Sequence, residues 1–248
     1  MRPALSIVIP ACNEEARISA TLRATRAFLD QRAAAAPASA PTQAFEILVV
    51  DDGSRDGTAA LVEAQRAEDP RVTLLRLPHN QGKGAAVRTG VLRSRGERVL
   101  FMDADLATPL SELAKLEAAL AQGAAVAIAS RALPDSQILQ RQHPLRQTLG
   151  KTFNVLVRAL SMTGFRDTQC GFKLFTRAAA DALFRESTVD RFAFDVELLL
   201  LARGRFRVAE VPVRWRHVEE SKVSVLRDAT RMAYDVVRMR VRLARRRW

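Results

Sequence analysis

The sequence predicts an α/β fold in which a mostly parallel central sheet is flanked by helices. Short β-branched runs alternate with helical segments through the first half of the chain, a pattern typical of repeated strand-helix units. Acidic and polar residues directly follow several of the predicted strands. The chain has 248 residues, 48% hydrophobic and 27% charged, so it can bury an ordinary core, which argues against disorder and against a small disulfide-rich protein.

Strands and helices alternate regularly up to about residue 130. We expect strands at residues 5–9, 45–50, 72–77, 98–102 and 124–129. Helices are expected between them, at residues 14–29, 58–68, 84–94 and 111–121. The alanine-rich segment 33–44 contains two prolines, and we expect it to be an exposed loop within one of these units.

The alternation weakens in the second half of the chain. We expect a polar loop at residues 133–147, a helix at 149–162, an apolar helix within 186–205 and a late strand at 208–213. The chain has only two cysteines, which favours a reducing, cytosolic setting, and it has no apolar run of the roughly 20 residues that a membrane span needs. The apolar run at the start is too short for a signal peptide, so any membrane contact is expected to be peripheral.

Basic residues are concentrated at the end of the chain. The formal charge is +12, and residues 222–248 carry nine basic side chains against two aspartates. Apolar residues recur there at helical spacing, and five arginines follow the opposite face: Arg227, Arg231, Arg238, Arg242 and Arg245. Such an amphipathic helix suits an anionic membrane, a nucleic acid, or plain packing on the protein with a solvated arginine face.

Acidic clusters follow three of the predicted strands. Glu14 and Glu15 come after the first strand, Asp51 and Asp52 after the second, and Asp103-Ala104-Asp105 after the fourth. Parallel strands bring their carboxyl ends to one edge of a sheet, where ligands bind, so these clusters are expected to converge. Asp103 and Asp105 could hold Mg²⁺ or Mn²⁺, and helix capping or turn chemistry is the alternative.

Five segments carry a resemblance to known enzymes. They are residues 6–15 (SIVIPACNEE), 49–58 (VVDDGSRDGT), 80–84 (NQGKG), 103–105 (DAD) and 167–175 (DTQCGFKLF). The first four resemble family 2 glycosyltransferases, and the last is the most specific sign of the dolichyl-phosphate β-glucosyltransferases and their polyprenyl-phosphate relatives. The resemblance implies a GT-A catalytic domain over residues 1–222. The basic amphipathic helix that the residue spacing predicts would follow it at 223–248.

The resemblance also implies roles for individual residues. Pro10, Ala11, Glu14 and the pair Asp51 and Asp52 would form the nucleoside pocket, and Asp103 and Asp105 would hold the metal. Lys83 would contact the nucleotide, although a short glycine-rich turn also explains its segment. Arg131 would lie near phosphates, with a surface arginine as the alternative. Ser221 and Lys222 resemble a late phosphate-contacting pair, with His217 and Arg214 as further candidates.

The implied reaction is an inverting transfer of a hexose, with glucose favoured, from a UDP-sugar to a polyprenyl or dolichyl phosphate. The acceptor phosphate is already anionic at neutral pH, so Asp195 and Glu197 would orient the acceptor or support a loop rather than act as a strong base. GDP-mannose as donor and a non-lipid acceptor are the alternatives.

A lipid acceptor gives the basic helix a membrane-facing role, with peripheral attachment to the cytoplasmic face of a membrane. Packing on the protein and self-association into a homo-oligomer remain open for that helix. Nucleic acid is disfavoured by the acidic strand ends and by an aromatic content of only 6%. Many relatives carry a transmembrane anchor that we do not find in this sequence.

Overall fold

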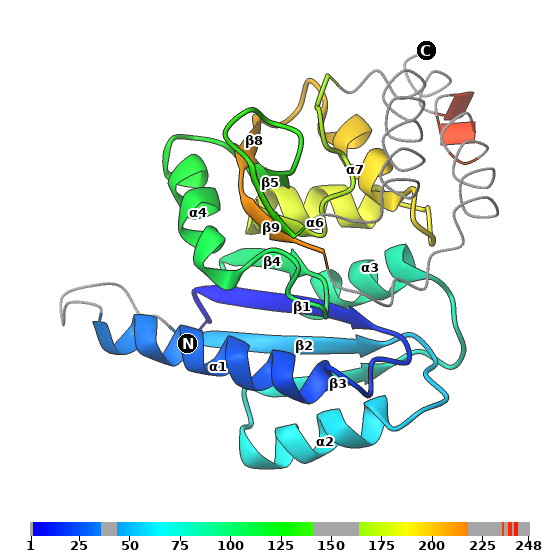
Figure 1. The fold of residues 1–248 in the computed structure, drawn as a ribbon. Coiled ribbons are helices and arrows are strands. Elements are labelled where there is room, and N and C mark those ends of the chain that lie inside the picture. The colour runs from blue at the N-terminus through cyan, green and yellow to red at the C-terminus, as the bar shows by residue number, and fades with distance from the viewer. Residues whose placement is uncertain are drawn as a thin grey trace.

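A seven-stranded sheet forms the centre of the structure (Figure 1), a computed structural model that describes residues 2–35, 44–140 and 164–217, Asp235, residues 238–239 and residues 241–242. The strand order is β3-β2-β1-β4-β7-β5-β8. The strands are β1 (Leu5–Ala11), β2 (Phe45–Asp51), β3 (Val72–Arg76), β4 (Arg98–Met102), β5 (Val126–Ser130), β7 (Phe172–Thr176) and β8 (Val208–Pro212). The predicted α/β class and the predicted strands are confirmed.

The first half of the sheet is parallel. β1 pairs with both β2 and β4, and β2 pairs with β3, all in parallel register. Residues along β2 are buried throughout, as expected for a β-branched strand that is covered by helices on both faces. The carboxyl ends of β1, β2 and β4 therefore meet at one edge, toward the right of Figure 1.

β7 is the exception, because it runs antiparallel between β4 and β5. Met102, the last residue of β4, lies opposite Phe172, the first residue of β7. An antiparallel strand begins at the edge where its parallel neighbours end, so the residues before Phe172 lie beside the residues that follow Met102. This one reversal brings the segment 167–171 to the same edge as Asp103.

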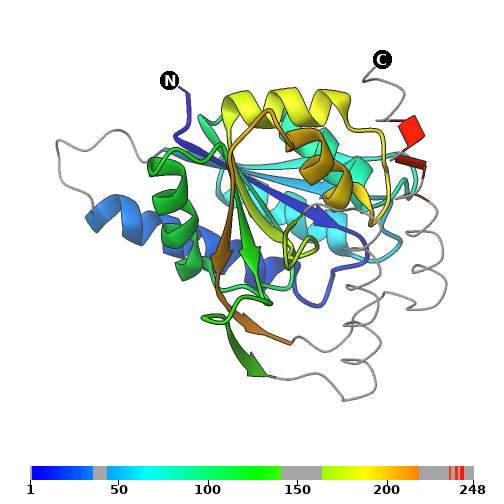
Figure 2. The ribbon, with the colours of Figure 1, turned by 90° about the horizontal axis from the view of Figure 1, so that it is seen from above.

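Helices cover both faces of the sheet (Figure 2). One face carries α1 (Ile18–Ala35), α2 (Thr58–Glu68) and α4 (Leu113–Ala121), whose buried side chains form one apolar cluster with β1 and β2. The other face carries α3 (Lys83–Arg93), α6 (Arg177–Glu186) and α7 (Phe194–Ala202), which form a second cluster. Edge-to-face contacts such as that of Phe101 with Phe194, with ring centroids 5.6 Å apart, join β4 to α7.

The apolar helix expected within 186–205 is confirmed as α7, whereas α6 before it was not expected. Two other sequence expectations need correction. The loop expected at 133–147 contains β6 (Gln137–Gln140), which pairs with β9 (Arg214–Arg216) in a two-stranded sheet. α1 extends to Ala35, into the loop expected at 33–44, because alanine favours a helix. The helix expected at 149–162 lies outside the described residues.

Candidate active site

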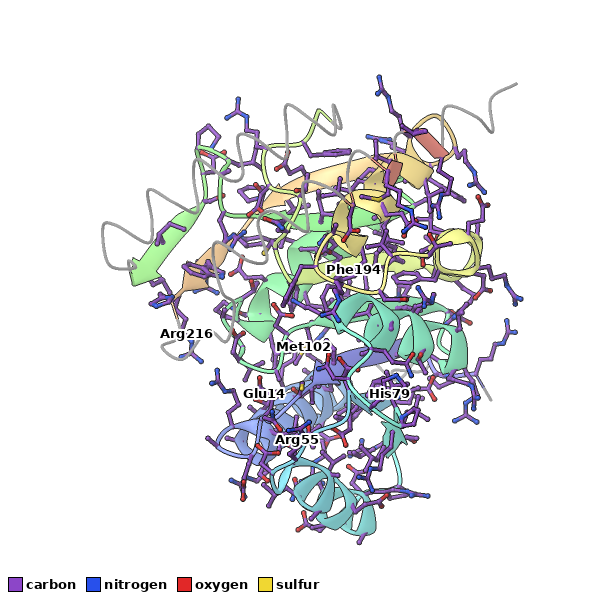
Figure 3. The ribbon with its side chains drawn as sticks, turned by 90° about the vertical axis from the view of Figure 1, so that its right-hand side faces the viewer. Glu14, Arg55, His79, Met102, Phe194 and Arg216 are labelled. Carbon is purple, nitrogen blue, oxygen red and sulfur yellow. The ribbon has the colours of Figure 1, made fainter. Side chains whose placement is uncertain are left out.

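A cavity of about 470 Å³ opens at the carboxyl edge of the parallel strands. Figure 3 views the molecule from this side and shows Glu14, Arg55 and His79 in the loops after β1, β2 and β3. The predicted residues that line the cavity are Pro10, Ala11, Glu14, Asp52, Lys83, Asp103 and Asp105. The lining also includes Asn80 of the predicted segment 80–84, and residues that the sequence analysis does not single out, among them Arg17, Arg191 and Phe192.

Hydrogen bonds between the loops after β1 and β2 hold Glu14 at the cavity. The Asn13 N–H donates to Ser54 Oγ at 2.8 Å, and the Arg55 N–H donates to Asn13 Oδ1 at 2.8 Å. The Glu14 N–H donates to Thr58 Oγ1 at 2.7 Å. Asn13 has a φ of 55°, which asparagine tolerates better than most residues because its short side chain bonds locally.

The two aspartates after β2 have different surroundings. Asp52 lines the cavity, and its carboxylate accepts the N–H groups of Gln81 at 2.7 Å and Gly82 at 2.9 Å. Burial raises the pKa of Asp52 above its usual value, against these two bonds. Asp51 is fully buried, accepts the Ser54 N–H at 2.9 Å and does not line the cavity. Of the predicted pair, Asp52 is therefore the one that lines the cavity.

Close backbone packing explains the glycines beside Lys83. A Cβ atom on Gly82 would lie 2.4 Å from the carbonyl oxygen of Asp190, and one on Gly84 would lie 2.4 Å from that of Val189. Gly82 also has a φ of 112°, which favours glycine. The glycines thus let the turn before α7 pack against the start of α3, where Lys83 is the first residue.

Lys83, Asp103 and Asp105 form the charged part of the cavity. Lys83 Nζ lies 2.7 Å from Asp103 Oδ1, and Asp105 Oδ1 accepts the Ala107 N–H at 2.9 Å. Burial, and then the charge of Asp103, raise the pKa of Asp105. A Cβ atom on Gly171 would lie 1.9 Å from Asp103 Oδ2, so Gly171 leaves the space that this carboxylate occupies.

The donor set of Asp103 and Asp105 fits a divalent cation. Both side chains offer the hard oxygen atoms that Mg²⁺ and Mn²⁺ prefer, and the Lys83 ammonium already lies against one of them. Within the described ranges, no group of three or more His, Cys, Asp or Glu side chains has a metal-binding arrangement. A cation held by the two aspartates would take its other ligands from phosphate oxygens and water.

Arg131 is bound to Asp167 and does not line the cavity. Its Nε and Nη2 donate to the two carboxylate oxygens of Asp167 at 2.7 and 2.9 Å, and its guanidinium lies 5.4 Å from the ring centroid of Trp215. Burial alone would raise the pKa of Asp167, but the Arg131 charge and bonds lower it to about 2. The phosphate-binding role of Arg131 stays a prediction.

Asp195 forms a buried ion pair with Lys173 of β7. Burial raises the pKa of Asp195, and the Lys173 ammonium opposes that rise. Asp195 does not line the cavity. The ring of Phe101 lies 5.4 Å from Lys83 Nζ and 5.8 Å from Lys173 Nζ. The carboxylate predicted to orient an acceptor thus bonds to a side chain of the neighbouring strand.

Glu197 holds the turn that reaches the cavity. Its carboxylate is fully buried and accepts the N–H groups of Thr188 and Val189, both at 2.9 Å. The same turn carries Arg191 and Phe192 into the cavity lining. The structure therefore places Glu197 in the loop-supporting arrangement that the sequence allowed for it.

The described residues near the C-terminus contact α7. Arg242 binds the Glu197 carboxylate, and Met239 is buried against Ala193 and Val196. Met239 belongs to the predicted apolar stripe, whereas Arg242 belongs to the predicted arginine face, so at least that arginine contacts the protein. The amphipathic helix as a whole, with the domain boundary at 222, lies largely outside the described residues and stays a prediction.

The remaining predicted site residues are not gathered at the cavity. Arg214 Nε donates to Glu112 Oε1 at 2.6 Å, and the His217 ring lies beside Trp215 with centroids 6.1 Å apart. Ser221 and Lys222 lie outside the described residues.

Comparison with known families decides the classification. Residues 6–184 match the family model described as glycosyl transferase family 2, which is more than half of the chain. The chain belongs to glycosyl transferase family 2. It is therefore a glycosyltransferase, as the five sequence segments predicted, and the cavity at the strand ends is the candidate active site of a family 2 enzyme.

The curated relatives are more specific. The chain is 41% identical over 242 residues to a dolichyl-phosphate beta-glucosyltransferase of Trichomonas vaginalis, covering 95% of this chain and 70% of that protein. It is 40% identical to the enzyme of that name from Drosophila melanogaster (96% and 74% covered) and 38% identical to that from Homo sapiens (98% and 77%). The predicted resemblance to this group within family 2 is confirmed.

Solved structures confirm the GT-A fold. Glucosyl-3-phosphoglycerate synthase from Mycobacterium tuberculosis superposes with a TM-score of 0.68 at 19% identity, covering 96% of this chain and 79% of that one. Its complex with Mn²⁺, uridine diphosphate and glucosyl-3-phosphoglycerate gives a TM-score of 0.66 at 18% identity, covering 96% and 78%. At this identity the likeness establishes the fold alone.

Proposed function

We propose that this chain transfers glucose from UDP-glucose to dolichyl phosphate or a related polyprenyl phosphate, with inversion at the anomeric carbon and with a divalent cation. The observation that carries the proposal is the cavity that joins Asp52 to Asp103 and Asp105 at one sheet edge. Relatives at 38–41% identity are named for the same lipid-phosphate reaction, and structural neighbours were crystallised with Mn²⁺ and UDP-glucose.

Different residues of the cavity would bind the nucleoside, the cation and the phosphates. Asp52 and Glu14 face the part of the cavity that a nucleoside would fill, and Asp103 and Asp105 would hold the cation. When bound, the cation would supply a charge that stabilises the leaving diphosphate. Lys83 also lines the cavity, and its ammonium can donate hydrogen bonds to phosphate oxygens.

The nucleophile needs little help from a base. A phosphate monoester has a second pKa of about 6, so its oxygen is mostly anionic at neutral pH. That oxygen attacks the anomeric carbon as the bond to the UDP oxygen breaks. Asp195 is buried against Lys173 and does not line the cavity, which supports a phosphate acceptor over a hydroxyl acceptor that would need a free base.

The acceptor side of the proposal concerns the basic C-terminal segment. No helix within the described part of the chain is long and apolar enough to cross a membrane. We propose peripheral attachment at the cytoplasmic face, with the basic residues of 222–248 attracted to anionic headgroups and Ser221 and Lys222 near the acceptor phosphate.

A donor and acceptor panel tests the proposal. The purified chain is incubated with UDP-glucose or GDP-mannose, with Mg²⁺, Mn²⁺ or EDTA, and with a short polyprenyl phosphate or the matching polyprenol. We expect lipid-phosphate glucose only from UDP-glucose, the phosphorylated lipid and a cation, with product detected by mass spectrometry and its anomeric configuration by NMR. Transfer to the polyprenol or another hydroxyl acceptor, with no glucose on the lipid phosphate, would overturn it.

A further inference from the structure

We propose that Lys83 occupies the cation position beside Asp103 until substrate arrives, and so couples divalent-cation binding to nucleotide binding. The inference rests on the proposed function, because it concerns how the cation and the nucleotide bind in the same cavity. Its basis is the 2.7 Å contact between Lys83 Nζ and Asp103 Oδ1, one of the two carboxylates that would hold the cation.

The backbone around Lys83 is fixed by its neighbours. The Ala85 N–H donates to the Asp190 carbonyl at 3.0 Å, and Gly82 and Gly84 lie in close contact with the turn that contains Asp190 and Val189. The side chain of Lys83 is 23% exposed and passes over the ring of Phe101. The start of the side chain is therefore fixed, and only its flexible end, which carries the ammonium, can move within the cavity.

The charges around the ammonium explain why it rests on Asp103. A lysine side chain is charged at neutral pH, and the Lys83 ammonium lies 2.7 Å from the nearer carboxylate oxygen of Asp103. Asp195 already has Lys173 as its buried partner. The two carboxylates that would hold the cation, Asp103 and Asp105, thus have Lys83 as a nearby counter-charge among the described residues.

This arrangement has a thermodynamic consequence. A divalent cation that binds Asp103 must displace the ammonium or lie next to it, and either change disfavours cation binding to the empty protein. A nucleoside diphosphate removes that penalty, because its phosphate oxygens give Lys83 another anionic partner. Cation and nucleotide should therefore strengthen each other's binding, and linkage requires the two effects to be equal.

Direct binding measurements on the full chain test the coupling. Free Mn²⁺ is measured by electron paramagnetic resonance with and without UDP, for the wild type, Lys83→Gln, Lys83→Arg and Lys115→Gln. The last variant removes the same charge from a half-exposed lysine on α4, which pairs with Glu112 outside the cavity. The Mn²⁺–UDP association constant is measured separately, and far-UV circular dichroism checks the fold of each variant.

For the wild type we expect UDP to tighten Mn²⁺ binding by about 5-fold or more, a usual size for coupling between two sites. Lys83→Gln should bind Mn²⁺ alone about 5-fold more tightly than the wild type, and UDP should then tighten Mn²⁺ binding by a smaller factor than in the wild type. Lys83→Arg keeps the charge and should keep the coupling, and Lys115→Gln should match the wild type. A folded Lys83→Gln that binds Mn²⁺ alone no tighter than the wild type overturns the inference. A wild type that binds neither Mn²⁺ nor UDP contradicts the proposed function instead.

Discussion

The cavity has two walls that are built in different ways. The first wall consists of the residues that follow β1, β2 and β4, and it includes Glu14, Asp52, Asp103 and Asp105. The second wall consists of residues 164–202, which contribute Arg191 and Phe192 to the lining and place Gly171 beside Asp103. Strand ends create the first wall directly, whereas the second wall depends on an antiparallel strand and a turn.

The carboxylates of the two walls differ in the same way. Those of the first wall face the cavity, where a ligand can reach them. Asp167, Asp195 and Glu197 of the second wall are each at most 3% exposed. Their partners are Arg131, Lys173 and Arg242. We infer that charge in the first wall serves binding and chemistry, and that charge in the second wall stabilises the fold around them.

Asp195→Asn should have the largest effect on stability. It leaves the Lys173 ammonium buried without its carboxylate, and breaking a buried ion pair from one side costs about 3–5 kcal/mol. The free energy of unfolding, measured with urea at neutral pH, should fall by that amount.

A double variant separates a structural role of Asp195 from a catalytic one. Replacing the whole pair, with Lys173→Met and Asp195→Leu, removes both buried charges and should recover most of the lost stability. If Asp195→Asn instead keeps wild-type stability but loses transfer activity, Asp195 acts on substrate, and the contrast between the two walls fails at this residue.

Gly171→Ala changes a residue of the second wall and should displace a carboxylate of the first wall. The new Cβ atom would lie 1.9 Å from Asp103 Oδ2, so the carboxylate must move away from its place beside Asp105. Transfer should fall by about 10²–10³-fold, the usual cost of losing one group that stabilises developing charge. Asp103→Asn should cause a similar loss, and the double variant should be little worse than either single one. Independent, multiplying losses would show that Gly171 does not act through Asp103.

The first wall could be predicted from sequence because one rule places it. Asp52, Asp103 and Glu14 each follow an apolar strand, and parallel strands end at a common edge. The same rule predicts Asp51 there as well, but Asp51 is buried and does not line the cavity, because strand alternation points neighbouring side chains in opposite directions. To predict the side-chain direction of a residue at a strand end, one must know the exact residue at which the strand ends.

The second wall could be predicted only as a motif. The segment 167–175 carries a family resemblance, but nothing in its residue pattern shows that β7 runs antiparallel, or that Lys173 meets Asp195 across 22 positions of sequence. Arg191 and Phe192 gave no signal, because their place in the lining depends on backbone contacts of the turn with Gly82 and Gly84. Pairings of this kind follow from tertiary packing rather than from local periodicity.

Asp167→Asn should have an intermediate, pH-dependent effect. Arg131 lowers the pKa of Asp167 from 3.8 to about 2, so the charged carboxylate stabilises the folded protein above pH 3.8, and that contribution disappears as the pH falls through about 2. The shift corresponds to about 2 kcal/mol at neutral pH. Urea unfolding should show this deficit for the variant at pH 7 and a shrinking deficit below pH 4. A deficit that does not change with pH would mean that packing, not charge, explains the loss.

Arg242→Ala should have the smallest effect and extends the comparison to the basic C-terminal segment. Arg242 binds the buried Glu197 that holds the second wall, whereas Arg238 is exposed. Arg242 is partly exposed and Glu197 keeps the N–H groups of Thr188 and Val189, so loss of the Arg242 contact should lower the free energy of unfolding by about 1 kcal/mol. Arg238→Ala removes the same charge and should leave stability unchanged. On anionic vesicles the order should reverse, with Arg238→Ala binding more weakly and Arg242→Ala binding like the wild type, because a guanidinium engaged by Glu197 is not available to lipid headgroups. Weaker vesicle binding by Arg242→Ala at wild-type stability would instead assign this arginine to the membrane.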